Sequence, residues 1–336
     1  MTLSDAIKQE ALGLGFDAVG ISRVDSPLSS AISSQPIPPP PHPATPLSRL
    51  LFNRLADWLQ RGYHGTMDWM ERDPARRADP QQVLPDCRSV ISLGMNYYTP
   101  HRADERPGYG RIARYAWGED YHEVLKQRLE QLEGRIRTLA PGAKTRLYVD
   151  TGPVMEKAWA QQAGLGWVGK HSNLVSQRYG SWLLLGEILT TIDLDPNEPG
   201  TDLCGSCTLC VRACPTGAIT EAYVVDARKC ISYLTIELHR PGDEIPAELT
   251  TKLGNRIFGC DECLDVCPYN VNASPTMEQA FQPSPLTLAP PLTALSELSE
   301  RMFTATFRRS PIHRAKFQGL LRNVRIAIQN LRHVSS

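Results

Sequence analysis

The sequence "CGSCTLCVRACP", residues 204–215, sets four cysteines in the order C-x2-C-x2-C-x3-C-P. This spacing is typical of proteins that hold two [4Fe–4S] clusters, in which three of the four cysteines bind one cluster and the fourth binds the other. One such motif therefore predicts a second motif elsewhere in the chain.

The second motif is "FGCDECLDVCPYN", residues 258–270, which contains the same Cys-Pro pair. When the two C-x2-C-x3-C-P cores are aligned, the position that matches Cys204 is Ile257, which cannot bind iron. The nearby Cys230 is predicted to supply the missing ligand. Cluster one then takes Cys204, Cys207, Cys210 and Cys267, and cluster two takes Cys214, Cys230, Cys260 and Cys263.

A zinc site is the alternative use of these cysteines. Zinc sites usually combine two C-x2-4-C pairs and do not need the x3-C-P ending, so the spacing favours iron–sulfur clusters. The ninth cysteine, Cys87, precedes a predicted strand, and we expect it to be a buried structural thiol.

Length and composition suit a cytoplasmic globular protein of two or three domains. The chain has 336 residues, of which 41% are hydrophobic and 21% charged. The most apolar stretch, residues 181–192, is shorter than the ~20 residues that span a bilayer and contains Glu187. The N-terminus lacks the basic and apolar regions of a signal peptide, so we expect no membrane association.

Predicted strands and helices alternate up to about residue 195. The apolar segment 89–98 is expected to be a strand, and the amphipathic segment 120–140 a helix. This alternation predicts an α/β domain over residues 1–195. The proline-rich segment 27–46 inside it is expected to be an exposed, polyproline-like loop.

Two further regions follow. Residues 196–285 carry the cysteine motifs and are predicted to form an α+β, two-cluster ferredoxin-like domain. Residues 286–336 are predicted to be a short all-α segment. From Arg301 onward there are eight Lys or Arg residues and no Asp or Glu, while the whole chain has a net charge of zero. Such a basic segment suits either a nucleic-acid partner or a solvated helical face.

The sequence "GLGWVGKH", residues 164–171, nearly matches a phosphate-binding P-loop. His171 stands where a P-loop needs Ser or Thr, and the preceding residues 153–164 are predicted to be a helix rather than a strand. We therefore expect no nucleotide site. The glycines are instead expected to let the backbone approach a large ligand closely.

Asp150 ends the predicted strand "TRLYVD" and precedes the turn 151–153. A carboxyl at a strand end could donate a proton if burial raises its pKa. The structural alternative is a helix cap or a turn residue, and the residues alone favour that alternative.

Four stretches together carry a resemblance to a known family: "HGTMDWM" (64–70), "ARYAWGEDYH" (113–122), "VDTGPVMEKAWAQQAGLGWVGKHSNLV" (149–175) and "CISYLTIE" (230–237). With the two cysteine motifs, they make the chain resemble epoxyqueuosine reductases, enzymes of the queuosine tRNA-modification pathway. The resemblance covers nearly the whole chain.

The resemblance implies a cobalamin- and iron–sulfur-dependent oxidoreductase whose α/β domain binds cobalamin. The clusters would pass electrons from a low-potential donor to cobalt, and the reduced corrinoid would remove the epoxide oxygen of epoxyqueuosine at the tRNA wobble position. By residue matching, Asp150 is the expected proton donor, held protonated against the apolar corrin. The expected cobalamin contacts are Asp150, Ala113, Ser232 and Asp261, with Arg77 a weaker candidate.

Some features of the sequence need to be considered separately from this resemblance. "DYHEVL" (120–125) has only the D-x-H of the cobalt-binding motif D-x-H-x-x-G, so we expect base-off cobalamin without a protein His ligand. The C-terminal helices resemble a truncated form of the HEAT-like repeats that help relatives hold tRNA. We expect a monomer. The alternatives are another corrinoid and iron–sulfur reductase, such as a reductive dehalogenase, and a ferredoxin-like electron carrier.

Overall fold

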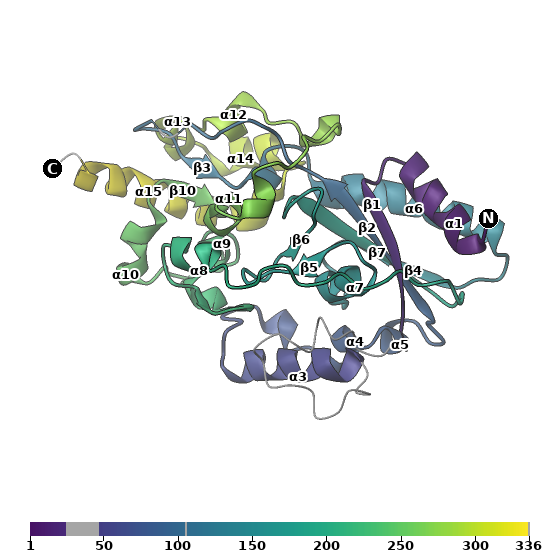
Figure 1. Cartoon of the computed structure of the whole chain (residues 1–336). Coiled ribbons are helices and arrows are strands. Elements are labelled where there is room, and N and C mark those ends of the chain that lie inside the picture. The colour runs from purple at the N-terminus through teal and green to yellow at the C-terminus, as the bar shows by residue number, and fades with distance from the viewer. Residues whose placement is uncertain (25–46, 105, 335–336) are drawn as a thin grey trace.

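The computed structural model describes residues 1–24, 47–104 and 106–334 (Figure 1). The predicted polyproline-like loop lies outside these residues. In the described part of the chain, no helix combines the length and apolar character needed to cross a membrane. Most of the apolar stretch 181–192 instead forms a strand, β7 (Leu183–Thr190).

The central sheet has the order β1-β2-β7-β4. Its other strands are β1 (Ala18–Arg23), β2 (Ser89–Asn96) and β4 (Thr145–Tyr148). All three pairings are antiparallel. An α/β fold in the strict sense has a mostly parallel sheet, so that part of the prediction is wrong for this domain. The reason is that an alternation of helices and strands along the chain does not by itself fix the direction of the strands.

Helices cover both faces of this sheet (Figure 1). On one face, α1 (Leu3–Gly13) and α6 (Tyr121–Leu139) bury apolar side chains against alternate residues of the strands. On the other face, α7 (Glu156–Gln162) and α3 (Leu47–Gln60) bury Trp159 and several leucines. The result is a three-layer core that holds the end of β4 in a fixed place.

The cysteine region is built from short elements. These are α8 (Leu209–Ala213), the hairpin β8 (Ile219–Glu221) and β9 (Val224–Val225), α9 (Ile231–Ile236), α10 (Ala247–Thr250), β10 (Arg256–Phe258) and α11 (Glu262–Asp265). Helix α8 packs against α11, so the two cysteine motifs lie side by side.

One strand links the two predicted domains. β3 (Arg111–Ile112) pairs in parallel with β10, which lies beside the second cysteine motif. Ile112 and Trp117 share a buried cluster with Phe258 and with residues of the C-terminal helices. The proposed division at residue 195 therefore separates the chain in sequence but not in space.

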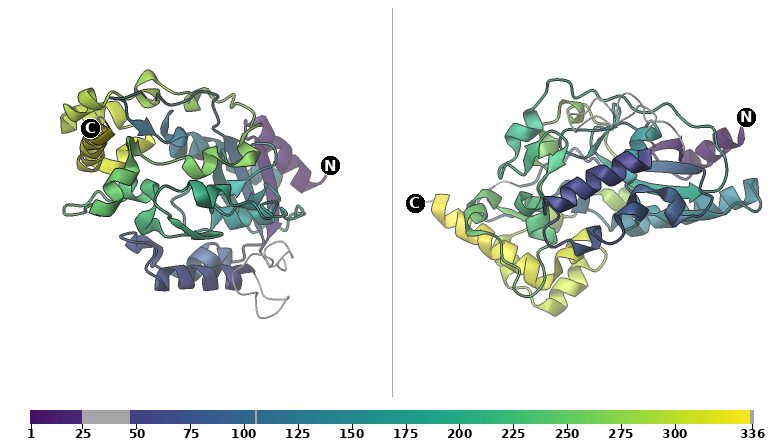
Figure 2. Two further views of the ribbon diagram at one scale, coloured as in Figure 1. Left: turned by 60° about the vertical axis from the view of Figure 1, so that its left-hand side comes forward. Right: turned by 90° about the horizontal axis from the view of Figure 1, so that it is seen from below.

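The C-terminal segment is helical, as predicted, and lies at the far side of the molecule from α1 (Figure 2). Its helices are α12 (Pro285–Leu288), α13 (Leu292–Ser296), α14 (Glu300–Phe307) and α15 (Lys316–Val334). Among the basic side chains that the structure describes in this segment, Arg309, Arg314 and Arg322 have partners within the chain. Arg309 pairs with Glu119 and Arg314 with Glu237, while Arg322 donates to the backbone carbonyls of Leu234 and Leu238.

Two short helices, α4 (Pro74–Ala78) and α5 (Pro80–Val83), lie between α3 and β2. The Gly-rich stretch forms no P-loop, because α7 is followed by the hairpin of β5 (Trp167–Val168) and β6 (Leu174–Val175). Helix α7 begins at Glu156, later than predicted, so Pro153 precedes the helix.

Candidate active site

A cavity of about 260 Å³ lies between the central sheet and the cysteine region. Four of the five residues that the sequence singled out as cofactor contacts line it: Ala113, Asp150, Ser232 and Asp261. Cys260 of the second cysteine motif lines the same cavity. Its other walls come from leucines, tyrosines and a few polar side chains, which are Tyr97, Tyr115, Tyr121, Glu156, Lys157, Asn173, Leu174, Ser181, Leu183, Leu184, Leu185 and Leu264.

Asp150 lies in the turn that follows β4. Its backbone is left-handed, with a φ of 55°, which is uncommon for a residue other than glycine. Residues held in such conformations cluster at active sites, where the surrounding structure keeps them in place. The Tyr121 hydroxyl donates to Asp150 Oδ2 over 3.0 Å. The turn therefore fixes the carboxylate at the cavity wall.

His122 joins two carboxylates in the first turn of α6. Its Nε2 lies 3.3 Å from Asp150 Oδ2, and its Nδ1 lies 2.8 Å from Asp120 Oδ1. Burial opposes a charge on this ring, but the hydrogen bonds and charges of both aspartates outweigh it and raise the pKa of His122 to about 9. The imidazole is therefore protonated at neutral pH.

The protonated His122 changes the state of Asp150. Burial would raise the pKa of the Asp150 carboxyl, but the hydrogen bonds from His122 and Tyr121 and the charges of His122 and Lys157 bring this pKa below its ordinary value. In the chain alone the pKa of Asp150 is therefore lowered, and the expectation that the carboxyl is held protonated against the corrin stays a prediction.

Asp261 and Ala113 meet where β3 approaches the second cysteine motif. The Arg114 backbone N–H donates to Asp261 Oδ2 over 2.7 Å. Burial raises the pKa of Asp261 to about 6. A side chain at Gly259 would stand 2.5 Å from the Ala113 Cβ, so only glycine permits this approach.

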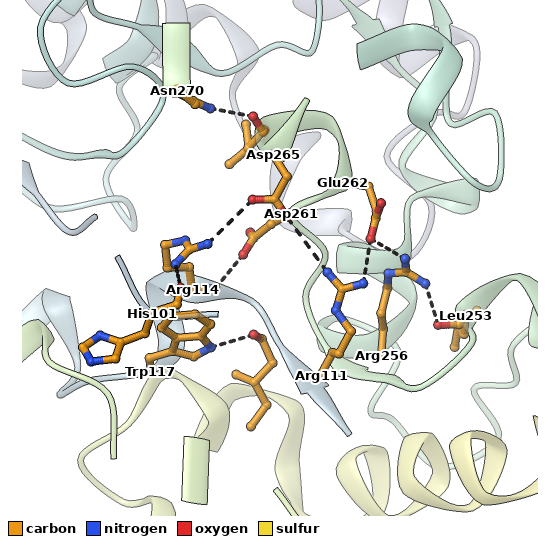
Figure 3. A network of polar contacts seen from close by, with 12 residues as sticks. His101, Arg111, Arg114, Trp117, Leu253, Arg256, Asp261, Glu262, Asp265 and Asn270 are labelled. Carbon is orange, nitrogen blue, oxygen red and sulfur yellow. Dashed lines mark hydrogen bonds and ion pairs between the residues drawn. The ribbon is translucent and has the colours of Figure 1, made fainter. Parts of the chain in front are cut away.

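An arginine network holds this region together (Figure 3). The Arg114 guanidinium lies over the rings of Trp117 and Trp182, 4.6 and 5.0 Å from their centroids, and 3.7 Å from the Asp265 carboxylate. Arg111 pairs with Glu262 over 2.9 Å. These contacts join the segment after β3 to α11 and so fix the second cysteine motif against the cavity.

Arg77 does not belong to the cavity lining given by the described residues. Its guanidinium donates to the Trp69 carbonyl over 3.1 Å and lies 5.1 Å from the centre of that ring. Burial lowers the pKa of Arg77, and the negative charge of Glu156 partly offsets this effect by raising it. This expected cofactor contact therefore stands apart from the other four.

The glycines of residues 164–171 serve the protein's own backbone. A Cβ at Gly164 would stand 2.6 Å from the Glu198 carbonyl oxygen, and one at Gly166 would stand 2.0 Å from that of Val175. None of these glycines lines the cavity as described. The expectation of close approach to a ligand is wrong, because the close neighbours are other segments of this chain.

Eight cysteines fall into two groups in space. Burial raises the pKa of the Cys210 thiol, and the nearby thiols of Cys204, Cys267 and Cys207 raise it further. Burial raises the pKa of Cys263 in the same way, with added effects from Cys230, Cys260 and Cys214. These two groups have the same members as the two predicted ligand sets, each with the four thiols that one [4Fe–4S] cluster would need.

Protein N–H groups point at two of these sulfurs. The Trp167 indole donates to Cys204 Sγ over 3.4 Å, and the Ala218 backbone donates to Cys214 Sγ over 3.2 Å. Hydrogen bonds to sulfur tune cluster potentials. Among the residues described, no three His, Cys, Asp or Glu side chains converge closely enough to hold a single metal ion. Cys87 is fully buried in the core, as expected.

Comparisons with known proteins identify the family of this chain. Residues 77–151 match the family model described as epoxyqueuosine reductase QueG, DUF1730, and residues 203–270 match a 4Fe-4S double cluster binding domain. A curated epoxyqueuosine reductase of Synechocystis is 45% identical over 82% of this chain and 94% of the relative. The chain belongs to the epoxyqueuosine reductase family.

Other members of the epoxyqueuosine reductase family match over almost the whole chain. The Escherichia coli epoxyqueuosine reductase is 41% identical over 98% of this chain and 81% of the relative. A solved epoxyqueuosine reductase with an epoxyqueuosine-modified tRNA-Tyr stem loop has a TM-score of 0.85 at 30% identity, covering 99% of this chain and 82% of that one. The chain is therefore an oxidoreductase with a double iron–sulfur domain.

Sequence reasoning missed several residues of this epoxyqueuosine reductase site. Tyr121 and His122, which contact Asp150, lie within "DYHEVL", where only a cobalt-binding motif was considered as a function for them. Glu156 and Lys157 line the cavity from the start of α7. A signal for all four was present, since they fall inside or directly beside the stretches that carry the family resemblance.

Proposed function

We propose that this chain reduces the epoxide of epoxyqueuosine at the wobble position of tRNA to give queuosine. Cobalamin occupies the cavity, and two [4Fe–4S] clusters supply its electrons. The observation that carries the proposal is that one cavity contains both Asp150 and Cys260, together with Ala113, Ser232 and Asp261. A proton donor and an electron source thus reach the same space.

The cluster ligands follow the two groups of cysteines. Cluster one takes Cys204, Cys207, Cys210 and Cys267, and cluster two takes Cys214, Cys230, Cys260 and Cys263. Because Cys260 lines the cavity, cluster two is the immediate source of electrons. Cluster one receives them from a low-potential donor, near the half-exposed Leu203 and Leu209 that flank its first cysteines.

The lining suits a corrinoid. Five leucines offer an apolar wall for a flat macrocycle, while Ser232 and Asp261 offer polar contacts for its amide rim. The small side chain of Ala113 also lines the cavity and takes little space from a large ring. At about 260 Å³ the cavity is slightly smaller than the roughly 300–1,000 Å³ of typical ligand pockets, so the cofactor would extend beyond it.

Reduced cobalamin supplies the electron pair that breaks the carbon–oxygen bond. Removing an epoxide oxygen as water consumes two electrons and two protons, so a proton donor is required. Asp150 faces the cavity and accepts hydrogen bonds from the protonated His122 and from Tyr121. A Bacillus subtilis relative with a TM-score of 0.84 and 28% identity was solved with its aspartate-bearing catalytic loop swung out of the active site. That finding supports a catalytic role for the loop of Asp150.

The proposal that the substrate is tRNA is supported by the relative that was solved with a modified tRNA stem loop. The C-terminal segment contributes positive charge through side chains such as Arg301, Arg308 and Arg325. Such residues contact phosphates, and an extruded anticodon base would reach the cavity from the surface.

The test is an anaerobic assay with reconstituted clusters, cobalamin, a low-potential reductant and tRNA that bears epoxyqueuosine. Mass spectrometry of the digested nucleosides should report queuosine, which should disappear when cobalamin is omitted. Asp150→Asn should slow conversion by about 10²–10⁴-fold, the usual contribution of a general acid. Asp193→Asn, on a surface aspartate that pairs with Arg23, is the matched control and should convert normally.

A further inference from the structure

Trp167 places its indole against the first cysteine motif. It lies in β5, is only 1% exposed, and its Nε1–H donates to Cys204 Sγ over 3.4 Å. Its ring also meets the Tyr269 ring edge to face, with the two centroids 4.7 Å apart. Tyr269 follows Cys267, a second proposed ligand of cluster one, by two positions. A buried contact between the two motifs therefore holds the indole N–H at a sulfur that is proposed to bind cluster one.

Lys170 brings a positive charge to the same motif. Its Nζ donates to the Gly205 carbonyl over 2.6 Å and to the Cys207 carbonyl over 2.9 Å, so it caps the loop that joins the first two cysteines. Burial raises the pKa of the Cys204 thiol, while hydrogen bonds from the Trp167 indole and the Lys170 backbone lower it. The segment that contains Trp167 and Lys170 thus gives this motif two N–H donors and a cation.

Tyr223 fixes the turn that carries Lys170. It lies between β8 and β9 with a φ of 71°, which is uncommon for a residue other than glycine. Its N–H donates to the Lys170 carbonyl over 3.0 Å, and its carbonyl accepts from the Ser172 hydroxyl over 2.8 Å. Its own hydroxyl donates to Asp202 Oδ2 over 2.5 Å. The same tyrosine therefore positions both Lys170 and Asp202.

Asp202 brings a negative charge to this motif. Its Oδ1 accepts from the Cys204 backbone N–H over 2.8 Å. Its charge adds to the effect of burial in raising the pKa of the Cys204 thiol. Lys170 and Asp202 therefore act with opposite signs on the same group of sulfurs.

These contacts matter for electron transfer because an iron–sulfur cluster gains a negative charge when it takes up an electron. Net charge and hydrogen bonds to sulfur are among the features that set the potential of such a cluster. An N–H donor and a nearby cation stabilise the reduced form more than the oxidised form, so they raise the potential, whereas a nearby carboxylate lowers it. Hydrogen bonds to a charged acceptor are also about twice as strong as those between neutral groups.

We propose that Trp167 and Lys170 are positioning residues that raise the reduction potential of cluster one, and that Asp202 opposes them. This inference rests on the proposed function, in which Cys204, Cys207, Cys210 and Cys267 hold cluster one. Each transfer moves one electron from the low-potential donor to cluster one and then to cluster two, and no bond forms or breaks. The raised potential makes cluster one a better acceptor for the donor and sets the driving force that remains for the next transfer.

The proposed ligands of cluster two have different neighbours. The Ala218 backbone N–H donates to Cys214 Sγ over 3.2 Å. Burial raises the pKa of Cys260, while a backbone hydrogen bond from Glu262 and the charge of Arg256 lower it. Changes at Trp167, Lys170 and Asp202 should therefore shift one of the two reduction steps and leave the other in place.

The test is a redox titration of the full chain with both clusters reconstituted and no tRNA, followed by electron paramagnetic resonance. The reduction step that remains in Cys230→Ala belongs to cluster one, because Cys230 is a proposed ligand of cluster two. Trp167→Phe keeps an aromatic ring and removes the N–H. It should lower the equilibrium constant for reducing cluster one by about tenfold, the order expected for a hydrogen bond to a charged group, which is a shift of about 59 mV for one electron.

The charged residues give a test of sign. Lys170→Met should shift the potential of cluster one downward, and Lys170→Arg should restore it. Asp202→Asn keeps an oxygen for the Cys204 N–H and should shift the same potential upward. Lys126→Met, on the exposed face of α6, is the matched control and should change neither step. A purely structural role would not move the potential in opposite directions for the two charges.

Several outcomes would overturn the inference. An unchanged potential of cluster one in Trp167→Phe and Lys170→Met, at full iron content, would do so. Equal shifts of both clusters, or shifts of the same sign for Lys170→Met and Asp202→Asn, would do the same. If Trp167→Phe binds no clusters, the variants of Lys170 and Asp202 decide, since both side chains are only partly buried. A wild-type protein that binds two clusters but makes no queuosine would refute the proposed function, while the titration still decides this inference.

Discussion

The Nε2 atom of His122 lies 3.3 Å from the Oδ2 atom of Asp150. The imidazole is held from its other side by Asp120, so the ring carries a positive charge between two carboxylates. This contact decides the protonation state of Asp150 in the chain alone. Any account of proton donation has to include His122.

His122→Gln should raise the pKa of Asp150. An opposite charge within ~4–6 Å usually lowers a carboxyl pKa by about 1–3 units, and that effect would be lost. The hydrogen bond from Tyr121 and the charge of Lys157 would remain and still oppose protonation, so the rise should be partial. Carboxyl ¹³C NMR of labelled aspartate measures the change. His101→Gln, an exposed histidine, is the control and should leave Asp150 unchanged. An unaltered Asp150 pKa in His122→Gln would contradict the contact.

The His122 contact should also make stability depend on pH. The folded pKa of about 9 lies above the ordinary 6.5, so the stabilisation is complete below pH 6.5 and is lost as pH rises through about 9. The melting temperature of the wild-type protein should exceed that of His122→Gln at mildly acidic pH. The difference should shrink at alkaline pH. A difference that grows with pH would have the wrong sign for this assignment.

Cys230→Ala should remove one cluster and spare the other. Cys230 is the proposed ligand of cluster two that lies outside both motifs, so iron and sulfide should fall to about half. Chemical analysis and electron paramagnetic resonance of the reduced protein measure this. Cys87→Ala is the matched control, since Cys87 is buried in the core far from both motifs in sequence. Full iron content in Cys230→Ala would show that the Cys230 thiol does not bind a cluster.

Arg114→Ala should destabilise the protein by about 3 kcal/mol, the upper range for a single substitution, because a buried hydrogen-bonding network is broken. The Arg114 side chain is 11% exposed, and its guanidinium donates to the carbonyls of Thr99 and His101. Thermal denaturation measures the loss. Arg106→Ala removes an arginine that is 73% exposed and should change stability little. Equal effects of the two substitutions would argue against the network.

Gly166→Ala should destabilise the hairpin of β5 and β6. Its Cβ would stand 2.0 Å from the Val175 carbonyl oxygen, so the backbone has to shift. Gly134→Ala, within α6, has no atom within 4 Å of the added Cβ and should stabilise by about 0.5–1 kcal/mol. Melting temperatures of the two variants should move in opposite directions. A neutral Gly166→Ala would show that the hairpin adapts without cost.

The double iron–sulfur domain was predictable because its information is local. The spacing of Cys204 to Cys214 encodes cluster chemistry within a few residues, and residues 203–270 match a 4Fe-4S double cluster binding domain. The assignment of Cys230 to a cluster stays a prediction. The buried position of Cys87 followed from its residue type and from the strand beside it.

The direction of the strands and the protonation state of Asp150 were harder to predict from the sequence, because both depend on contacts between residues that are distant in the chain. Nothing in the order of helices and strands fixes whether β2 and β7 run parallel, and they are antiparallel. The pKa of Asp150 depends on His122, on another element. The glycines near Gly166 were assigned to a ligand because sequence does not show which backbone lies opposite.

The pairing of β3 with β10 limits how this protein could be recombined or divided. A crossover or a cut near residue 195 leaves Arg111–Ile112 on one fragment and Arg256–Phe258 on the other. Each fragment would then carry an open strand edge and only part of a shared apolar cluster. The iron–sulfur region therefore cannot be moved into another protein by itself, and a chimaera needs β3 and β10 from the same parent.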